Sequence, residues 1–357
     1  MTSPSTSSTP RNDEYLLRVI DLVTEFHTEN GVVRAVDSIS FNLASGETLG
    51  LVGESGSGKS VTNLTIMGLL PGTARVPQGS VLYKGRELLG CTEKDLRAIR
   101  GREIAMIFQD PMTSLNPFLR VSRQLTEVLE VHLGMSRAEA RAASISMLEK
   151  VGIPDPANRI DSYPHELSGG MRQRVMIAMA LLCNPSILIA DEPTTALDVT
   201  IQAQILDLMR ELIGAMETAM VLVSHDLGVV AGMADRVVVM YAGKMMEEGP
   251  TERIFERPSH PYTLGLLRSI PRLDDTPQER LHSIEGLPPD PANLPPGCPF
   301  APRCPFRMDA CLEEFPVARE VEPGHRIRCH ADVGPDDADA FWTPAEEFQN
   351  VETREAP

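Results

Sequence analysis

The pattern of apolar and polar positions predicts an α/β protein. From residue 15 to about residue 267, short apolar runs alternate with stretches of helical periodicity. The runs at 47–52, 186–190 and 219–223 are mostly apolar, which is typical of strands buried in a parallel sheet. Strands of this kind that alternate with helices indicate an α/β fold.

A helical segment interrupts this pattern between residues 111 and 165. Strand signals are missing there, and Ser136 followed three residues later by Glu139 forms a capping box that marks a helix start. The helical periodicity continues to Val151 and stops before Gly152, a residue type that often ends helices. We therefore expect a helical subdomain within an α/β domain that covers residues 14–267.

The composition changes at both ends of the chain. Residues 1–13 are mostly polar or proline, which predicts a disordered tail. Fifteen of the 29 prolines and four of the six cysteines follow residue 270, so residues 268–330 should form an extension with little regular structure. Residues 331–357 carry eight acidic groups and one basic group, which predicts a solvated acidic tail.

Charge and hydropathy exclude several classes of protein. The 33 Lys and Arg residues against 50 Asp and Glu residues give a net charge of −17, which disfavours nucleic acid as a partner. The longest apolar run, residues 175–183, is shorter than the roughly 20 residues of a membrane-spanning helix. The N-terminus lacks the features of a secretory signal. We expect a cytosolic location, where the cysteines are reduced rather than paired in disulfides.

The strongest chemical motif is Gly53-Glu-Ser-Gly-Ser-Gly-Lys-Ser60, which follows an apolar run and precedes a helical one. It fits the phosphate-loop pattern, whose backbone N–H groups and helix N-terminus bind nucleotide phosphates. Lys59 would neutralise phosphate oxygens, and Ser60 would bind Mg²⁺. A Gly-rich turn without a ligand is the alternative. The strand and helix on either side favour the nucleotide site.

A pair of carboxylates ends the apolar run at 186–190. A carboxylate at the end of a buried strand is costly unless a cation or hydrogen bonds meet it. We expect Asp191 to reach Mg²⁺ through water and Glu192 to polarise the water that attacks the γ-phosphate. The alternative, a cap for the helix that begins near residue 199, suits Asp198 better.

A second phosphate-binding pattern lies between these two motifs. Ser168 is followed by two glycines and opens a helical run to Cys183, yet the chain already has a loop for its own nucleotide. At this point the sequence resembles the ATP-binding subunits of ABC transporters, over residues 15 to about 330. The resemblance implies an ABC-type P-loop ATPase with an antiparallel β subdomain and a helical subdomain. It also implies a dimer that holds each ATP between one subunit's phosphate loop and the other subunit's signature motif, which is residues 167–174 in this chain.

The resemblance implies a role for each motif in the family's order. The implied ATP contacts are Phe26 (stacked on adenine), Gly53, Ser55, Gly56, Gly58, Lys59, Ser60, Val61, Gln109 and Asp191. The implied contacts with the partner's ATP are Ser168, Gly169, Gly170 and Gln173, with Asp198 in the D-loop. The implied catalytic residues are Glu192, His225 and Gln109, and Gln109 joins Ser60 at Mg²⁺. Taken singly, Phe26 could be a core residue and His225 a structural histidine at a strand end.

Three further stretches narrow the resemblance. Residues 109–117, the Met-Arg-Gln-Arg form of the signature and His260-Pro-Tyr-Thr263 look like oligopeptide and dipeptide importer ATPases of bacteria. This implies a peripheral protein at the cytoplasmic face of the membrane, paired with a second ATPase subunit. The other implied partners are two membrane permeases and, indirectly, an extracytoplasmic solute-binding protein. The alternatives are a nickel, glutathione or other solute importer, or an ABC ATPase without a transport role.

Four cysteines lie close together in the extension: Cys298, Cys304, Cys311 and Cys329. Four thiolates can hold a proline-rich segment around a metal. Zinc sites usually contain closer Cys pairs, whereas four cysteines also suit a [4Fe–4S] cluster, which the resembling importers imply here. Zinc and plain thiols are the alternatives. Because the cysteines are far in sequence from Lys59 and Glu192, we expect a structural role that leaves ATP binding largely intact.

Overall fold

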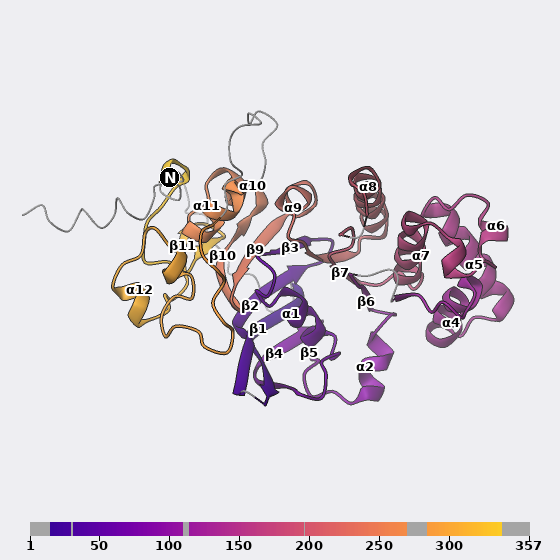
Figure 1. Ribbon diagram of the computed structural model, residues 1–357. Helices are drawn as coiled ribbons and strands as arrows, with labels where there is room; N and C mark the ends of the chain where they lie inside the picture. Colours follow the sequence, from indigo (N-terminus) through magenta and orange to yellow (C-terminus); the bar gives the residue numbers. More distant parts are fainter. Residues whose placement is uncertain (1–14, 30, 110–113, 196, 270–283, 338–357) are drawn as a thin grey trace, which may run out of the picture. The chain divides into compact units, whose positions relative to one another are not determined.

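The computed structural model describes residues 15–337 except 30, 110–113, 196 and 270–283 (Figure 1). The predicted tail at 1–13 and most of the acidic tail lie outside the described residues. The chain divides into two compact units. The first comprises residues 1–25, 37–49 and 60–223, and the second comprises 26–36, 50–59 and 224–357. Within the described residues, no helix combines the length and apolar character that crossing a membrane requires.

The first unit contains the predicted parallel strands. Strand β6 (Ile104–Ile107) pairs in parallel with β7 (Ile187–Asp191), which pairs in parallel with β8 (Ala219–Val223). All residues of β7 and β8 are buried, which explains their continuous apolar sequences. The buried strand predicted at 47–52 is β3 (Thr48–Val52). The structure therefore confirms the α/β prediction.

A four-stranded sheet with the order β2-β1-β4-β5 precedes the helical region. Its strands are β1 (Tyr15–Thr28), β2 (Gly31–Ala44), β4 (Ala74–Tyr83) and β5 (Arg86–Glu87). Strands β4 and β5 are antiparallel. Helix α1 (Lys59–Ile66) begins at the phosphate loop, and α2 (Glu93–Ile99) follows β5.

The predicted helical segment consists of α4 (Val121–Leu133), α5 (Arg137–Lys150), α6 (Pro156–Arg159) and the short η1 (Pro164–Glu166). Helices α4 and α5 also contact α7 (Gly169–Leu181), which in turn contacts α8 (Val199–Met216) (Figure 1). Both halves of the predicted capping box are present, because Ser136 Oγ accepts from the Glu139 N–H and the Glu139 carboxylate accepts from the Ser136 N–H.

The second unit contains antiparallel strands that join the end of the predicted ATPase domain (residues 14–267, called the cassette below) to the extension. Strand β9 (Arg236–Tyr241) pairs with β10 (Lys244–Pro250), β10 with β12 (His325–Ile327), and β12 with β11 (Arg319–Glu322). Its helices are α9 (Leu227–Met233), α10 (Thr251–Glu256), α11 (Pro261–Arg268), η2 (Ala301–Arg303) and α12 (Ala310–Glu313).

The core of the second unit is shared between the cassette and the extension. The ring of Phe300 lies 5.3 Å from that of Tyr241 and 5.2 Å from that of Tyr262, measured between centroids. Cys298 and Cys311 are buried in the same apolar cluster. The extension thus packs on the cassette's own core, although the sequence suggests a segment organised around a metal.

Candidate functional site

The backbone of the phosphate loop requires glycine at two positions. Gly53 has φ 148°, and a Cβ there would lie 2.1 Å from the carbonyl oxygen of Met240. Gly58 has φ 99°, and a Cβ there would lie 2.4 Å from the carbonyl oxygen of Ala35. The loop is also fastened by the N–H of Gly243, which donates to the Ser57 carbonyl at 3.0 Å. Close backbone approach therefore explains both glycines.

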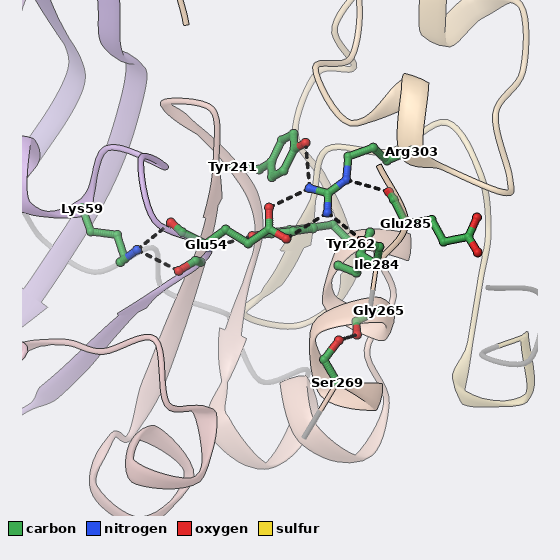
Figure 2. A network of polar contacts seen from close by, with 10 residues as sticks. Glu54, Lys59, Tyr241, Tyr262, Gly265, Ser269, Ile284, Glu285 and Arg303 are labelled. Atoms are coloured by element: carbon green, nitrogen blue, oxygen red, sulfur yellow. Dashed lines mark hydrogen bonds and ion pairs between the residues drawn. The ribbon is translucent and has the colours of Figure 1, made fainter. Parts of the chain in front are cut away.

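Lys59 lies buried inside the loop, with a relative exposure of 5%. Its ammonium donates to the carbonyl oxygens of Gly53 at 2.7 Å and Glu54 at 2.9 Å (Figure 2). It also donates to Ser57 Oγ at 3.2 Å, a residue that the sequence analysis does not assign to the site. Because a buried ammonium needs negative partners, these contacts hold a positive charge where a phosphate would gain most from it.

The first unit brings together two of the three residues predicted to serve Mg²⁺, Ser60 and Asp191. The Ser60 hydroxyl donates to Asp191 Oδ1 at 3.0 Å. Asp191 is the last residue of β7 and is 6% exposed. A hydroxyl and a carboxylate at this distance are suitable oxygen ligands for Mg²⁺ or its water shell.

Glu192 and Gln109 are in direct contact in the same unit. Gln109 Nε2 donates to Glu192 Oε2 at 2.8 Å, and Thr195 Oγ1 donates to the same oxygen at 3.0 Å. Glu192 has φ 48°, a left-handed conformation that is uncommon for this residue type. Strained backbone of this kind is frequent at functional sites. Thr195 adds a residue that the motif does not identify.

Ser168 of the signature and Asp198 of the D-loop each cap the start of a helix. Ser168 is the N-cap of α7, because its Oγ accepts from the Met171 N–H at 3.3 Å. Gly169 and Gly170 form the first turn of this helix. Asp198 caps α8, because its carboxylate accepts from the Ile201 N–H at 3.0 Å. This is the cap that the sequence pattern assigns to Asp198.

Gln173 differs from the other signature residues. Its side chain is 1% exposed, and its amide donates to the carbonyl oxygen of Pro193 within the same chain. Gln173 therefore lies one turn into α7 on its buried face, and the expected contact with a partner's ATP does not fit this orientation.

Two further predicted residues, Phe26 and His225, belong to the second unit, which also contains the phosphate loop as far as Lys59. Phe26 is half-buried on β1. His225 is exposed directly before α9, whose N-cap is the neighbouring Asp226. Val61, another predicted ATP contact, belongs to the first unit and lies in the first turn of α1.

The four cysteines of the extension interact with one another. Cys298 donates its N–H to the carbonyl oxygen of Cys311 at 2.8 Å. Burial, with smaller contributions from the neighbouring cysteines, raises the pKa of the Cys298 and Cys329 thiols to about 11 and that of Cys304 to about 12. Within the described part of the chain, no group of His, Cys, Asp and Glu is arranged to hold a metal ion.

The extension also contacts the phosphate loop, which no sequence motif indicated. Arg303 of η2 donates to both carboxylate oxygens of Glu54, at 2.6 and 3.1 Å (Figure 2). The Tyr262 hydroxyl accepts from the Glu54 N–H at 2.9 Å. The only local signals were a carboxylate within the loop and the segment His260-Pro-Tyr, and neither reveals a partner distant in sequence.

The fold, phosphate loop, strand-end carboxylates and signature helix define a P-loop ATPase of the ABC type. The model of the family described as "ABC transporter" matches residues 36–195, and that of "Oligopeptide/dipeptide transporter, C-terminal region" matches residues 246–311. A solved dimer of the ATP-binding cassette MJ0796, bound to ADP and Pi after hydrolysis, has a TM-score of 0.60 and 26% identity, covering 66% of this chain and 98% of that one.

The relatives extend the similarity to nearly the whole chain. The oligopeptide transport ATP-binding protein OppD of Salmonella typhimurium is 52% identical over 93% of this chain and 98% of its own length. The dipeptide transport ATP-binding protein DppD of Bacillus subtilis is 55% identical over 88% of this chain and 94% of its own. The chain belongs to the family of ATP-binding subunits of oligopeptide and dipeptide ABC transporters.

Proposed function

We propose that this chain hydrolyses ATP to power the import of oligopeptides or dipeptides through a membrane ABC transporter. The observation that carries this proposal is its identity of 52–55% to peptide-transport ATP-binding proteins, over the cassette and the C-terminal region together. Nickel, glutathione and other solute importers are the alternatives for the cargo.

The proposed ATP site uses the residues predicted from the motifs. Phe26 stacks on adenine, and Gly53, Ser55, Gly56, Gly58, Lys59 and Val61 surround the phosphates. Ser60, Asp191 and Gln109 serve Mg²⁺, and Glu192 polarises the attacking water with His225 at the γ-phosphate. Supporting observations are the Ser60–Asp191 contact, the Gln109–Glu192 contact and the buried Lys59. Ser168, Gly169, Gly170 and Asp198 would face the second subunit's nucleotide, and we leave Gln173 out of this group.

We propose the domain division 14–267 for the ATPase, with a helical subdomain at about 111–165, and 268–330 for the extension. The family matches at 36–195 and 246–311 support a cassette followed by a distinct C-terminal region. A second ATPase subunit would complete the dimer at the cytoplasmic face of the membrane, beneath two permeases and an external solute-binding protein. This chain contacts no nucleic acid in the proposed assembly.

The first unit offers a suitable face for a permease. A cavity of about 180 Å³ is lined by Phe108, Val128, His132 and Met176 among others, and Phe108 is 43% exposed. Phe118 is 87% exposed in the neighbouring segment of the sequence. Exposed apolar side chains such as these are typical of surfaces that bind another protein.

Substrate uptake separates the cargo alternatives. Cells that lack this chain should lose uptake of a labelled tripeptide or dipeptide, and a plasmid copy should restore it. Uptake of nickel and of glutathione in the same cells serves as the control and should not change. Loss of nickel or glutathione uptake with normal peptide uptake would replace the proposed cargo.

We further propose a [4Fe–4S] cluster on Cys298, Cys304, Cys311 and Cys329. Burial, helped by the charges of neighbouring cysteines, raises the pKa of Cys298, Cys304 and Cys329 and so disfavours free thiolates; a bound cationic centre would supply the missing stabilisation. No described group could hold a metal ion.

Iron analysis tests the cluster directly. Anaerobically purified protein should contain roughly four irons per chain and absorb broadly near 400 nm. Cys304→Ser should abolish both signals, whereas Cys183→Ser, outside the extension, should keep them. One zinc without iron, or no metal at all, would rule out the cluster.

A further inference from the structure

Arg303 joins the extension to the phosphate loop, and all three nitrogens of its guanidinium donate hydrogen bonds. Its guanidinium donates to both oxygens of Glu54, to Tyr241 Oη at 3.2 Å, and to the carbonyl oxygens of Ile284 and Glu285, each at 3.0 Å (Figure 2). The Arg303 side chain is 5% exposed, and that of Glu54 is 26% exposed. A bidentate pair of this kind is both strong and restrictive in geometry.

Glu54 connects this contact to the residue that binds phosphate. It is the second residue of the loop, its carbonyl accepts from the Lys59 ammonium, and its N–H donates to buried Tyr262. Arg303 and Tyr262 thus fix the side chain and backbone of the same residue. Any shift of Glu54 would move a partner of Lys59.

The negative charge of Glu54 would oppose the binding of phosphates if no cation lay beside it. Glu54, Ser55, Gly56 and Ser57 line a cavity of about 320 Å³ together with Tyr241 and the extension segment 288–291. A carboxylate within a phosphate loop repels a nucleotide's phosphates unless a cation neutralises it. Arg303 supplies that cation, so the loop keeps the net positive charge of Lys59.

We propose that Arg303 is a positioning residue for the phosphate loop, through which the extension sets the nucleotide affinity of its own subunit. The proposal rests on the ATP-binding role of the loop and adds a second determinant of affinity outside the motif. Arg303 acts through Glu54 and does not itself contact the nucleotide.

This contact changes the expectation for the cysteines. Arg303 directly precedes Cys304 and lies in the short helix η2 between Cys298 and Cys304. Whatever holds these cysteines therefore also holds Arg303 against Glu54. Disruption of the cysteine group should weaken ATP binding, although the sequence distance to Lys59 suggested that ATP binding would be spared.

Equilibrium binding of ATP to the purified full chain tests the proposal. Arg303→Met keeps an apolar stem and removes the charge, so ATP affinity should fall on the order of tenfold. The double variant Arg303→Met/Glu54→Gln removes the unpaired carboxylate as well and should recover affinity to within about threefold of the wild type. Arg307→Met, an exposed arginine of the same extension, is the matched control and should bind as the wild type does.

The rescue distinguishes electrostatic positioning from a merely structural role. An Arg303→Met variant that binds ATP normally, or a folded double variant as weak as the single one, would overturn the proposal. If Arg303→Met does not fold, Arg303→Lys keeps the cation beside Glu54 and should bind ATP within about threefold of the wild type. A folded Arg303→Lys that binds about tenfold more weakly would contradict the proposal. Failure of the wild-type chain itself to bind ATP would instead remove the ATP site.

Discussion

We assign Lys59 to ATP binding and Glu192 to hydrolysis, and single substitutions separate these two roles. Lys59→Ala removes the buried charge from the phosphate loop and should abolish tight ATP binding. Glu192→Gln keeps the shape and the contact with Gln109 but removes the carboxylate, so ATP binding should persist while hydrolysis falls by about 100-fold or more. Equilibrium ATP binding and steady-state hydrolysis by the assembled complex measure the two effects.

Two results would contradict these roles. Normal turnover by Glu192→Gln would take away its role with the attacking water. ATP affinity unchanged in Lys59→Ala would mean that the buried ammonium does not face the phosphates.

At the residue scale, the sequence predicts what lies inside a short motif. Lys59, Ser60 and Asp191 are identifiable because their chemistry depends on neighbours only a few positions away or on a strand end. The inward orientation of Gln173 depends on how α7 rotates against its surroundings, which the motif does not specify. The Arg303–Glu54 pair joins positions 249 residues apart, so no local pattern could reveal it.

At the element scale, helix starts were predictable and some helix ends were not. The capping box of α5 is a four-residue signal, and it is confirmed. Helix α1 ends at Ile66, close to Gly68, which adopts φ 62° and so ends the helix. Helix α7 ends at Leu181, so Cys183 lies beyond it, before Asn184 with φ 50° and Pro185. The pairing of β12 with β10 joins strands that are distant in the sequence, so no local pattern predicts it.

Helix α11 makes a prediction about pH. His260 is its N-cap, with Nδ1 accepting from the Tyr262 N–H at 3.0 Å, and burial lowers the pKa of His260 from 6.5 to about 3. The unfolded chain binds this proton below about pH 6.5 while the folded chain does not. The stabilisation is therefore complete above pH 6.5 and is lost as the pH falls toward 3, at about 1.4 kcal/mol per pH unit.

The matched variant for this effect is His260→Asn, which retains a capping acceptor and cannot titrate. Its free energy of unfolding should fall less steeply between pH 6.5 and 4.5 than that of the wild type, by about 1.4 kcal/mol per unit. Urea unfolding at several pH values measures both slopes. Equal slopes would mean that the histidine is protonated in the folded protein.

At the scale of the whole molecule, we expect a composite ATP site shared with a second subunit. Ser168→Arg would place a bulky cation where the partner's ATP lies, so hydrolysis at the partner's phosphate loop should be lost while ATP binding by this chain persists. Ser168→Ala is the control, because it removes only the helix cap, which is worth about 1 kcal/mol. Equal defects in the two variants would assign the loss to the cap and not to the composite site.

The coupling of hydrolysis to peptide import is the central claim, and proteoliposomes containing the complete transporter test it most directly. ATP hydrolysis and uptake of a labelled peptide are measured in the same vesicles, with wild-type chain or with Glu192→Gln. We predict that the wild type shows peptide-stimulated hydrolysis and uptake, and that Glu192→Gln loses both while still binding ATP. Peptide uptake that continues at the wild-type rate with Glu192→Gln would contradict the claim that this chain's hydrolysis drives import.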